Sequence, residues 1–502
     1  MVTLPRIIQG GMGVGVSNWR LARAVSSTGQ LGVVSGTALD QVFVRRLADG
    51  DHGGHMRRAM DAFPFPEMAR RLWNEYFISG GKAAGAPYPA TPMHQLHEPK
   101  KLIELCLAAN FAEVFLAREG HSHPVGINFL EKVQLPHLAS IYGAMLAGVG
   151  YVLMGAGIPL HIPGVLDALT YHEAAEYKLQ VTGAVAGQGE DATMRLVPAE
   201  YAEGPLPPLK RPRFVAIVSS HTLAATLLRR ANGTVDGFVV EGPTAGGHNA
   251  PPRGKLQLSG TGEPLYGERD RVDTAGFRAL GVPFWLAGGY ASQAKLEEAL
   301  AEGATGVQVG TAFAFSRESA LRADLKSGLL AQAKAGAASV FTDPLASPTG
   351  YPFKVAQVVG TLSDAGTYAA RTRVCDMGFL REAYAREDGK IAYRCPAEPT
   401  SCYTAKGGQL EATEGRKCLC NALLANIGLA QVRANGTVEA PLVTLGDDLN
   451  IVRRFLPAGG TSYAAADVVR VILGQGDVAQ PAEVFATGDF TVADAAEPSL
   501  RG

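Results

Sequence analysis

Short apolar runs recur along the first two-thirds of the chain, each followed by glycine or polar residues and then by a helix-like segment. Runs of this length, alternating with helical periodicity, predict parallel strands linked by helices. Eight such units are enough to close a barrel, so we predict an α/β fold, a (β/α)8 TIM barrel, over residues 1–318. The predicted strands are 6–9, 31–34, 125–129, 151–154, 214–218, 235–240, 283–286 and 306–309.

Two parts of the chain depart from this alternation. Residues 49–99 are rich in Gly, Pro, His and aromatic residues, with one helical stretch at 67–77. Long loops in compact domains are usually functional, so we expect this insertion to be an active-site lid or a dimer contact. Residues 319–485 predict a mainly helical C-terminal extension packed on the barrel, and 486–502 predict a disordered tail. The helices predicted in the extension are 319–334, 421–432 and 464–473.

Composition limits the classes of partner. The chain has 502 residues, 47% hydrophobic and 19% charged, with a formal net charge of -1. A chain without a strong positive field is not expected to bind nucleic acid or an anionic membrane. Its longest apolar stretches, such as 144–160, are broken by glycine and proline and are poor membrane spans. We see no basic start followed by an apolar leader, and we expect a soluble cytoplasmic protein.

The cysteines are unevenly placed. Cys106 stands alone, and five others lie in the last third of the chain. A cytosolic protein keeps its thiols reduced, so disulfides are not expected. The spacing of these cysteines fits no usual zinc pattern, since Cys418 and Cys420 have only one residue between them and no histidine is nearby. We therefore predict structural thiols, with no metal site and no catalytic cysteine. The five are Cys375, Cys395, Cys402, Cys418 and Cys420.

The chemistry is indicated at three predicted strand ends. One strand leads into 241–248, which ends in Gly-Gly-His, the next into 287–289, and the third into Gly310 and Thr311. Glycine at the start of a helix exposes backbone amides, and parallel barrels hold phosphate groups there. The alternative is a set of tight turns without a ligand. We predict a site for a phosphorylated cofactor, with His248 as its ionisable group.

His248 is the predicted catalytic residue. A neutral imidazole accepts a proton and its protonated form donates one, so this residue suits C–H bond chemistry next to a cofactor. The alternative is a loop histidine that only caps a strand or helix. His221 also follows a strand end and is a secondary candidate. The histidines of the insertion are not predicted to bind metal; they are His52, His55, His94 and His97.

Four segments, in the same order, resemble the nitronate monooxygenase (2-nitropropane dioxygenase) family. They are 7–12, 241–248, 287–289 and 307–311. They also resemble the related FMN-dependent enoyl-ACP reductases. The resemblance implies a (β/α)8 barrel with a small added subdomain and non-covalently bound FMN. Residues 341–354 are similar to a longer branch, which includes the free-standing enoyl reductases of polyketide and polyunsaturated fatty acid synthases.

Beside this resemblance, the residues predict how FMN is held. Gly288 and Gly289 let amides approach the phosphate, and Thr311 adds a hydroxyl. Asn128 is a bidentate partner for a flavin ring edge or a ribityl hydroxyl, although a core asparagine is the alternative. The full set of predicted cofactor-binding residues is Gly10, Gly11, Met12, Asn128, Ser219, Gly247, Ala287, Gly288, Gly289, Gln308, Gly310 and Thr311.

Three functions remain open. The first, placed slightly ahead, is an FMN-dependent nitronate monooxygenase that uses O2 on a small-molecule nitronate. The second is an enoyl reductase that takes hydride from NAD(P)H and acts on a substrate bound to acyl carrier protein. The third is a non-catalytic flavin-binding scaffold, against which His248 and the intact glycine turns argue. A homodimer is compatible with each.

Overall fold

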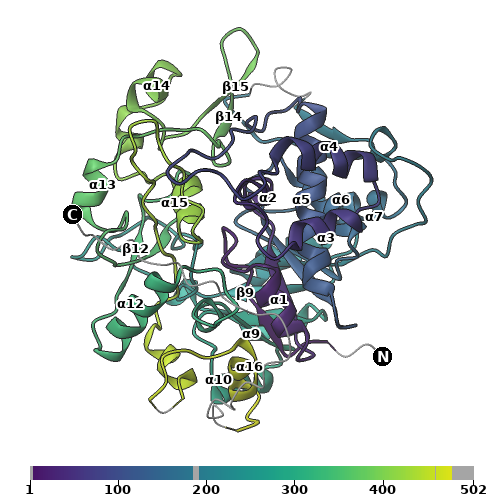
Figure 1. The fold of residues 1–502 in the computed structure, drawn as a ribbon. Coiled ribbons are helices and arrows are strands. Elements are labelled where there is room, and N and C mark those ends of the chain that lie inside the picture. Colours follow the sequence, from purple (N-terminus) through teal and green to yellow (C-terminus); the bar gives the residue numbers. More distant parts are fainter. Residues whose placement is uncertain (1–3, 185–191, 458, 477–502) are drawn as a thin grey trace.

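The barrel predicted from the sequence is present in the computed structural model, which describes residues 4–184, 192–457 and 459–476 (Figure 1). Eight parallel strands follow the order β1-β11-β10-β9-β8-β4-β3-β2. The two end strands meet, because the Gln9 amide donates to the Leu31 carbonyl at 2.9 Å. The strands are β1 (Ile7–Gln9), β2 (Gly32–Ser35), β3 (Val125–Leu130), β4 (Tyr151–Gly155), β8 (Arg213–Val218), β9 (Gly237–Glu241), β10 (Phe284–Ala287) and β11 (Gly306–Val309).

Apolar side chains fill the inside of the barrel. Ile8, Val33, Leu153 and Val239 belong to one buried cluster that also contains Trp285. The Trp285 indole donates a hydrogen bond to the Pro5 carbonyl at 2.7 Å, so its one polar group is satisfied. A barrel filled in this way is not a pore, and a ligand must bind at its rim.

Helices surround the barrel, and several begin at residues that cap them. Asn18 accepts from the Leu21 amide, Ser220 from that of Leu223 and Ser292 from that of Lys295. These side chains satisfy amides that have no partner in the first turn. In the described part of the chain, no helix is both long and apolar enough to cross a membrane. The helices are α1 (Trp19–Ser26), α2 (Leu39–Ala48), α5 (Lys100–Arg118), α6 (His137–Leu146), α7 (Ile162–Thr170), α8 (His221–Arg230), α9 (Thr274–Ala279), α10 (Gln293–Ala301) and α11 (Thr311–Ala314).

The insertion at 49–99 forms α3 (His55–Asp61) and α4 (Pro66–Tyr76), which pack on α5. The helix predicted at 67–77 is present. None of the described residues that line the two cavities at the barrel rim comes from the insertion, so the cavity walls give no support to an active-site lid, which stays a prediction. The dimer contact stays a prediction.

A second excursion, between β4 and β8, was not predicted. It contains β5 (Ala175–Lys178), β6 (Val181–Thr182) and β7 (Thr193–Leu196).

A buried histidine attaches the insertion to the barrel helices. His94 Nδ1 contacts Glu98, and His94 Nε2 lies 3.3 Å from Asp40 Oδ2 and 3.9 Å from Cys106 Sγ. Burial opposes a charge on this ring, but Cys106, Glu98 and Asp40 together raise the pKa of His94 well above its usual value. His94 thus connects the insertion, through Glu98 and Asp40, to α2 and the start of α5.

The C-terminal extension contains two antiparallel hairpins that the prediction of a mainly helical extension missed. The hairpins escaped prediction because each of their strands contains polar or charged residues and none forms a continuous apolar run. The helix predicted at 421–432 ends at Ala425, and the predicted tail at 486–502 lies outside the described residues. The elements are β12 (Val340–Asp343), β13 (Phe353–Ala356), β14 (Glu382–Ala385), β15 (Ile391–Arg394), α12 (Ala323–Lys334), α13 (Ala365–Ala370), α14 (Thr400–Ala405), α15 (Leu419–Ala425) and α16 (Ala465–Ile472).

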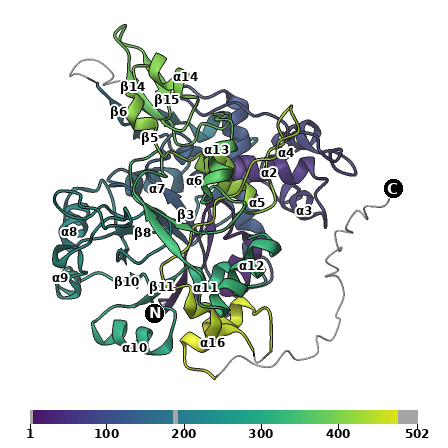
Figure 2. The ribbon, with the colours of Figure 1, turned by 90° about the vertical axis from the view of Figure 1, so that its left-hand side faces the viewer.

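The extension runs along one side of the molecule. Helices α12, α13 and α14 lie opposite to α3, α4 and α7 (Figure 1). Strands β14 and β15, joined to β6, stand at one end, whereas α16 lies beside α10 at the other (Figure 2). The extension therefore spans the length of the barrel and has access to its rim.

Candidate active site

The glycine turns surround a cavity of about 240 Å³ at the carboxyl ends of the strands, which we call the cofactor cavity. His248 lines it together with all but one of the predicted cofactor-binding residues. The exception, Ser219, lies on a second cavity of about 230 Å³, the adjoining cavity. The predicted residues that meet at the cofactor cavity are Gly10, Gly11, Met12, Asn128, Gly247, Ala287, Gly288, Gly289, Gln308, Gly310 and Thr311.

The turn after β10 requires glycine for two different reasons. Gly288 has a φ of +100°, and a Cβ there would lie 2.7 Å from Thr244 Oγ1 and 3.1 Å from the Ala245 nitrogen. Gly289 has a φ of +78°, but a Cβ there would meet no atom within 4 Å. Both positions favour glycine conformationally. Only Gly288 is also needed for the close approach of the turn to the loop after β9.

Polar groups of β3 and β11 face the same cavity. A Cβ at Gly11 would lie 2.3 Å from Asn128 Cβ, so the missing side chain makes room for the asparagine. Gln308 Oε1 is buried and has no hydrogen-bond partner within the described residues. A buried acceptor of this kind needs a donor, and an N–H at the edge of an isoalloxazine ring is one. The residues present therefore fit a flavin.

The extension closes the cavity with a segment that the sequence did not single out, residues 444–448, which we call the strap. Thr444 Oγ1 accepts from the Gly247 amide at 3.0 Å, and the Gly446 amide donates to Thr311 Oγ1 at 2.9 Å. Thr311 can therefore still donate its own hydroxyl proton to a phosphate. The strap has no motif that would reveal it in the sequence. The extension residues on the cavity wall are Phe353, Phe379, Leu380, Leu419, Cys420, Leu423, Thr444, Leu445, Gly446, Asp448 and Ile451.

His248 is held by the hairpin β12–β13. Its Nε2 lies 2.7 Å from Ser347 Oγ, and the Phe353 ring packs against it edge-on at 4.7 Å between centroids. The backbone is fixed as well, because the Lys354 amide donates to the Gly247 carbonyl at 3.0 Å. Burial lowers the pKa of His248 to about 4, so the imidazole is neutral at neutral pH and can accept a proton. Sequence analysis did not identify Ser347.

His248 and Glu241 lie on the wall between the two cavities and line both of them. Glu241 ends β9, and burial raises its pKa to about 7. The adjoining cavity also carries Arg253, whose guanidinium donates to the Ser219 carbonyl at 2.9 Å. The arrangement puts a neutral base and a carboxyl that titrates near neutrality between a cofactor cavity and a second chamber. His221 is exposed and pairs with Asp273 instead.

Comparisons with known proteins agree with the sequence analysis. Residues 202–345 match the family model described as nitronate monooxygenase. No curated protein sequence matches the chain significantly.

Solved structures with a similar fold include three enzymes of low sequence identity. FabK from Thermotoga maritima has 16% identity and a TM-score of 0.46, covering 94% of this chain and 92% of that chain. The nitroalkane oxidase from Streptomyces ansochromogenes has 17% identity and a TM-score of 0.43, covering 94% and 97%. The enoyl reductase domain of MlnA from Bacillus amyloliquefaciens has 11% identity and a TM-score of 0.43, covering 94% and 95%.

The family match spans β8 to β11 with their three glycine turns and His248. Over these strands the chain is therefore similar to the nitronate monooxygenases.

Proposed function

We propose that the protein is an FMN-dependent nitronate monooxygenase, which oxidises with O2 an alkyl nitronate that is either bound as such or formed in the site from the nitroalkane. The observation that carries the proposal is the position of His248, a neutral imidazole on the wall between the cofactor cavity and the adjoining cavity. From this wall a base can reach a substrate in one chamber while the cofactor occupies the other. The family match over the same strands supports this choice.

FMN, rather than FAD, suits the residues of the cofactor cavity. Gly288, Gly289 and Thr311 would hold one terminal phosphate, and Asn128 and Gln308 would hold the ring edge. The chain has no Gly-x-Gly-x-x-Gly unit after β1 to hold a dinucleotide. Bound FMN would supply the two-electron redox chemistry. Denaturing the purified protein and identifying the released flavin tests this, and FAD would contradict it.

The chain itself would manage the proton. His248 would accept the α-proton of a nitroalkane, since its lone pair is free when the ring is neutral. Ser347, at 2.7 Å from His248 Nε2, would hold the ring in one orientation. The Phe353 ring and the strap would exclude water from the reacting atoms.

A second candidate is an enoyl reductase that uses NAD(P)H and an acyl-carrier-protein substrate. The observation in its favour is that residues 341–354, similar to the longer reductase branch, form the hairpin that holds His248. In this reaction a protonated His248 would donate a proton to the α-carbon of the reduced enoyl thioester. The pKa of about 4 disfavours that protonated form at neutral pH, which places this candidate second.

Anaerobic stopped-flow spectroscopy separates these candidates. Bleaching of the flavin by an alkyl nitronate alone supports the monooxygenase. Bleaching by NADPH supports the reductase and contradicts our first choice. A flavin that neither compound bleaches would leave the non-catalytic scaffold.

A further inference from the structure

Four cysteines of the extension line one small cavity, which we call the cysteine cavity. Cys375 precedes β14, Cys395 follows β15, and Cys418 and Cys420 lie at the start of α15. They come from three segments that are separate in the sequence. Most of the remaining wall is apolar, including Val374, Met377, Leu380 and Leu419. The fold therefore brings together four soft sulfur ligands that local spacing does not reveal.

The sulfurs are too widely spaced for a single metal ion. Four thiolates on one zinc lie roughly 3.8 Å apart, because each Zn–S bond is about 2.3 Å. In the described part of the chain, the only set of three or more potential ligand atoms within 4.8 Å of one another is that of Asp40, His94 and Cys106. The four cysteines thus line a shared cavity, but their sulfur atoms do not lie close enough together to bind one metal ion. This arrangement suits a ligand with several metal atoms.

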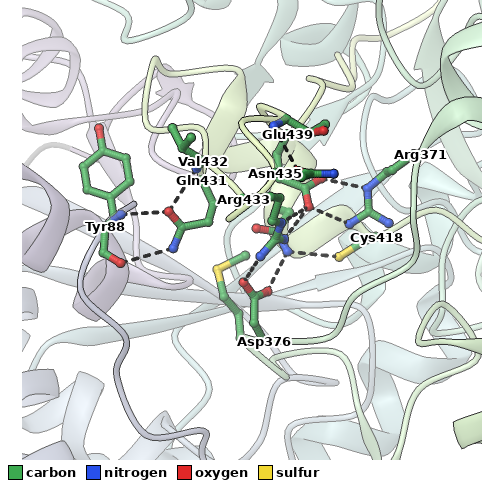
Figure 3. Close-up of polar contacts among 12 residues, drawn as sticks. Tyr88, Arg371, Asp376, Cys418, Gln431, Val432, Arg433, Asn435 and Glu439 are labelled. Carbon is green, nitrogen blue, oxygen red and sulfur yellow. Dashed lines mark hydrogen bonds and ion pairs between the residues drawn. The ribbon is translucent and has the colours of Figure 1, made fainter. Parts of the chain in front are cut away.

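A polar network supports the cavity on the side of Cys418 (Figure 3). Asn421 Nδ2 donates to Cys418 Sγ at 3.5 Å and to Asp376 Oδ1 at 2.8 Å. Arg433 holds Asp376 at 2.6 Å and also pairs with Glu439. A hydrogen bond from an amide to a ligating sulfur is common at metal sites, where it orients the ligand and affects metal affinity and redox potential.

Positive charge lies next to the same cysteine. Arg371, Arg373, Arg416 and Lys417 line a cavity of about 160 Å³ that also touches Cys418. Arg371 and Lys417 are paired with Glu439 and Asp343, whereas Arg373 and Arg416 bond to backbone carbonyls and a tyrosine hydroxyl. Within the described residues neither Arg373 nor Arg416 forms an ion pair with a carboxylate, and their two charges would stabilise a negatively charged group bound by four thiolates.

We propose that Cys375, Cys395, Cys418 and Cys420 bind an iron–sulfur cluster. Four cysteine thiolates are the ligand set of both the two-iron and the four-iron types. The proposal replaces the expectation of structural thiols, which rested on zinc spacing within a single segment.

The cluster would lie next to the flavin. Leu380, Leu419 and Cys420 line both the cysteine cavity and the cofactor cavity. A cluster gains or loses one electron, so it would pass electrons singly from a one-electron donor protein of the ferredoxin class to the flavin, as a second source of electrons beside the organic substrate. Two such transfers, with two protons from water, complete the two-electron reduction. This relay rests on the proposed flavin site, whereas the cluster itself does not.

The test uses the full chain, purified without oxygen and assayed for iron, acid-labile sulfide, zinc and FMN. We expect about two or about four irons per chain with equal sulfide, the number identifying the cluster type. Dithionite should produce an electron paramagnetic resonance signal of a reduced cluster. Cys395→Ser and Cys418→Ser should each lower bound iron about tenfold or more. Cys402→Ser is the matched control, because this cysteine is exposed and outside the cavity.

Several results would overturn the proposal. Stoichiometric zinc in place of iron would contradict it. So would a chain that circular dichroism shows to be folded but that binds no iron after incubation with ferrous iron and sulfide. Equal iron in Cys395→Ser, Cys418→Ser and Cys402→Ser would also do so. Flavin without a cluster refutes only this inference, and a cluster without flavin refutes only the proposed FMN site.

Discussion

The barrel rim and the C-terminal extension contribute to the cofactor cavity in different ways. The rim offers mainly backbone, at the turns of 287–289 and 310–311, where side chains are small or missing. The extension offers side chains, with Ser347 and Phe353 on His248 and Thr444 on Gly247. We therefore expect the rim to bind the proposed cofactor and the extension to orient His248 and close the site.

The extension also holds itself over the rim. Lys354 is buried on β13, and its Nζ lies 2.7 Å from Asp447 Oδ2 in the strap and 2.8 Å from Thr342 Oγ1. The Asp447 amide donates to the Thr244 carbonyl at 3.2 Å. Hairpin, strap and loop after β9 therefore form one connected unit around His248. The following substitutions test this division of roles, beginning with the largest expected effect.

His248→Asn should keep FMN and lower turnover of a nitroalkane by about two to four orders of magnitude, the range for losing a general base. A preformed nitronate has already lost its α-proton, so its oxidation should suffer much less. Steady-state kinetics on both substrates give the ratio of the two losses. Equal losses would show that His248 positions the ligand and does not move its proton.

Gly288→Ala should weaken FMN binding by about tenfold or more relative to Gly289→Ala, because only at 288 would the new Cβ lie 2.7 Å from Thr244 Oγ1. Both variants carry the cost of roughly 1–2 kcal/mol for a left-handed non-glycine residue. Gly289→Ala is the matched control, with similar backbone strain but no atom within 4 Å. Flavin titration by fluorescence measures both. Equal affinities in the two variants would rule out the close approach as the cause.

Ser347→Ala should lower kcat about five- to tenfold with FMN binding unchanged, the effect of losing a hydrogen bond worth about 1 kcal/mol. Thr349→Val is the control, since Thr349 Oγ1 contacts Ser347 at 2.8 Å but is not bonded to His248. An unchanged kcat in Ser347→Ala would contradict the role of the extension in orienting His248. A loss of FMN in this variant would contradict the assignment of cofactor binding to the rim.

Glu241 should produce a pH dependence near neutrality. Burial raises its pKa to about 7, so a negative charge forms between the cavities as pH rises through this value. A bound nitronate anion is then repelled, and kcat/KM for the nitronate should fall above about pH 7. Glu241→Gln should remove this decline and leave the rest of the profile unchanged. A decline that persists in the variant would assign it to another group.

The same ionisation affects stability. A carboxyl whose folded pKa is raised binds its proton more tightly in the folded chain. Its contribution to the free energy of unfolding is therefore full below the ordinary value of 4.5 and is lost as pH rises through about 7. His248, with its pKa lowered to about 4, is already neutral in most molecules above pH 5 and does not titrate near pH 7.

The sequence by itself determined the barrel and its rim. Each strand and the glycine turn after it are encoded by neighbouring residues. An apolar run of four to six residues followed by glycine favours a buried strand that ends in a turn. All eight strands were predicted, and so was the meeting of Gly11, Asn128, Gly288 and Thr311 at one cavity, since parallel strands end on the same face. His248 belonged to the same pattern.

Only the tertiary structure decided what the extension contributes. Ser347 lies 99 residues from His248, and Thr444 lies 197 residues from Gly247, so no spacing rule links these pairs. Cys375, Cys395 and Cys418 are likewise neighbours only because the ends of one hairpin, β14–β15, and a short helix, α15, pack together. Contacts between distant segments depend on which surfaces are left to be buried once the barrel has formed, and that packing is a property of the whole chain.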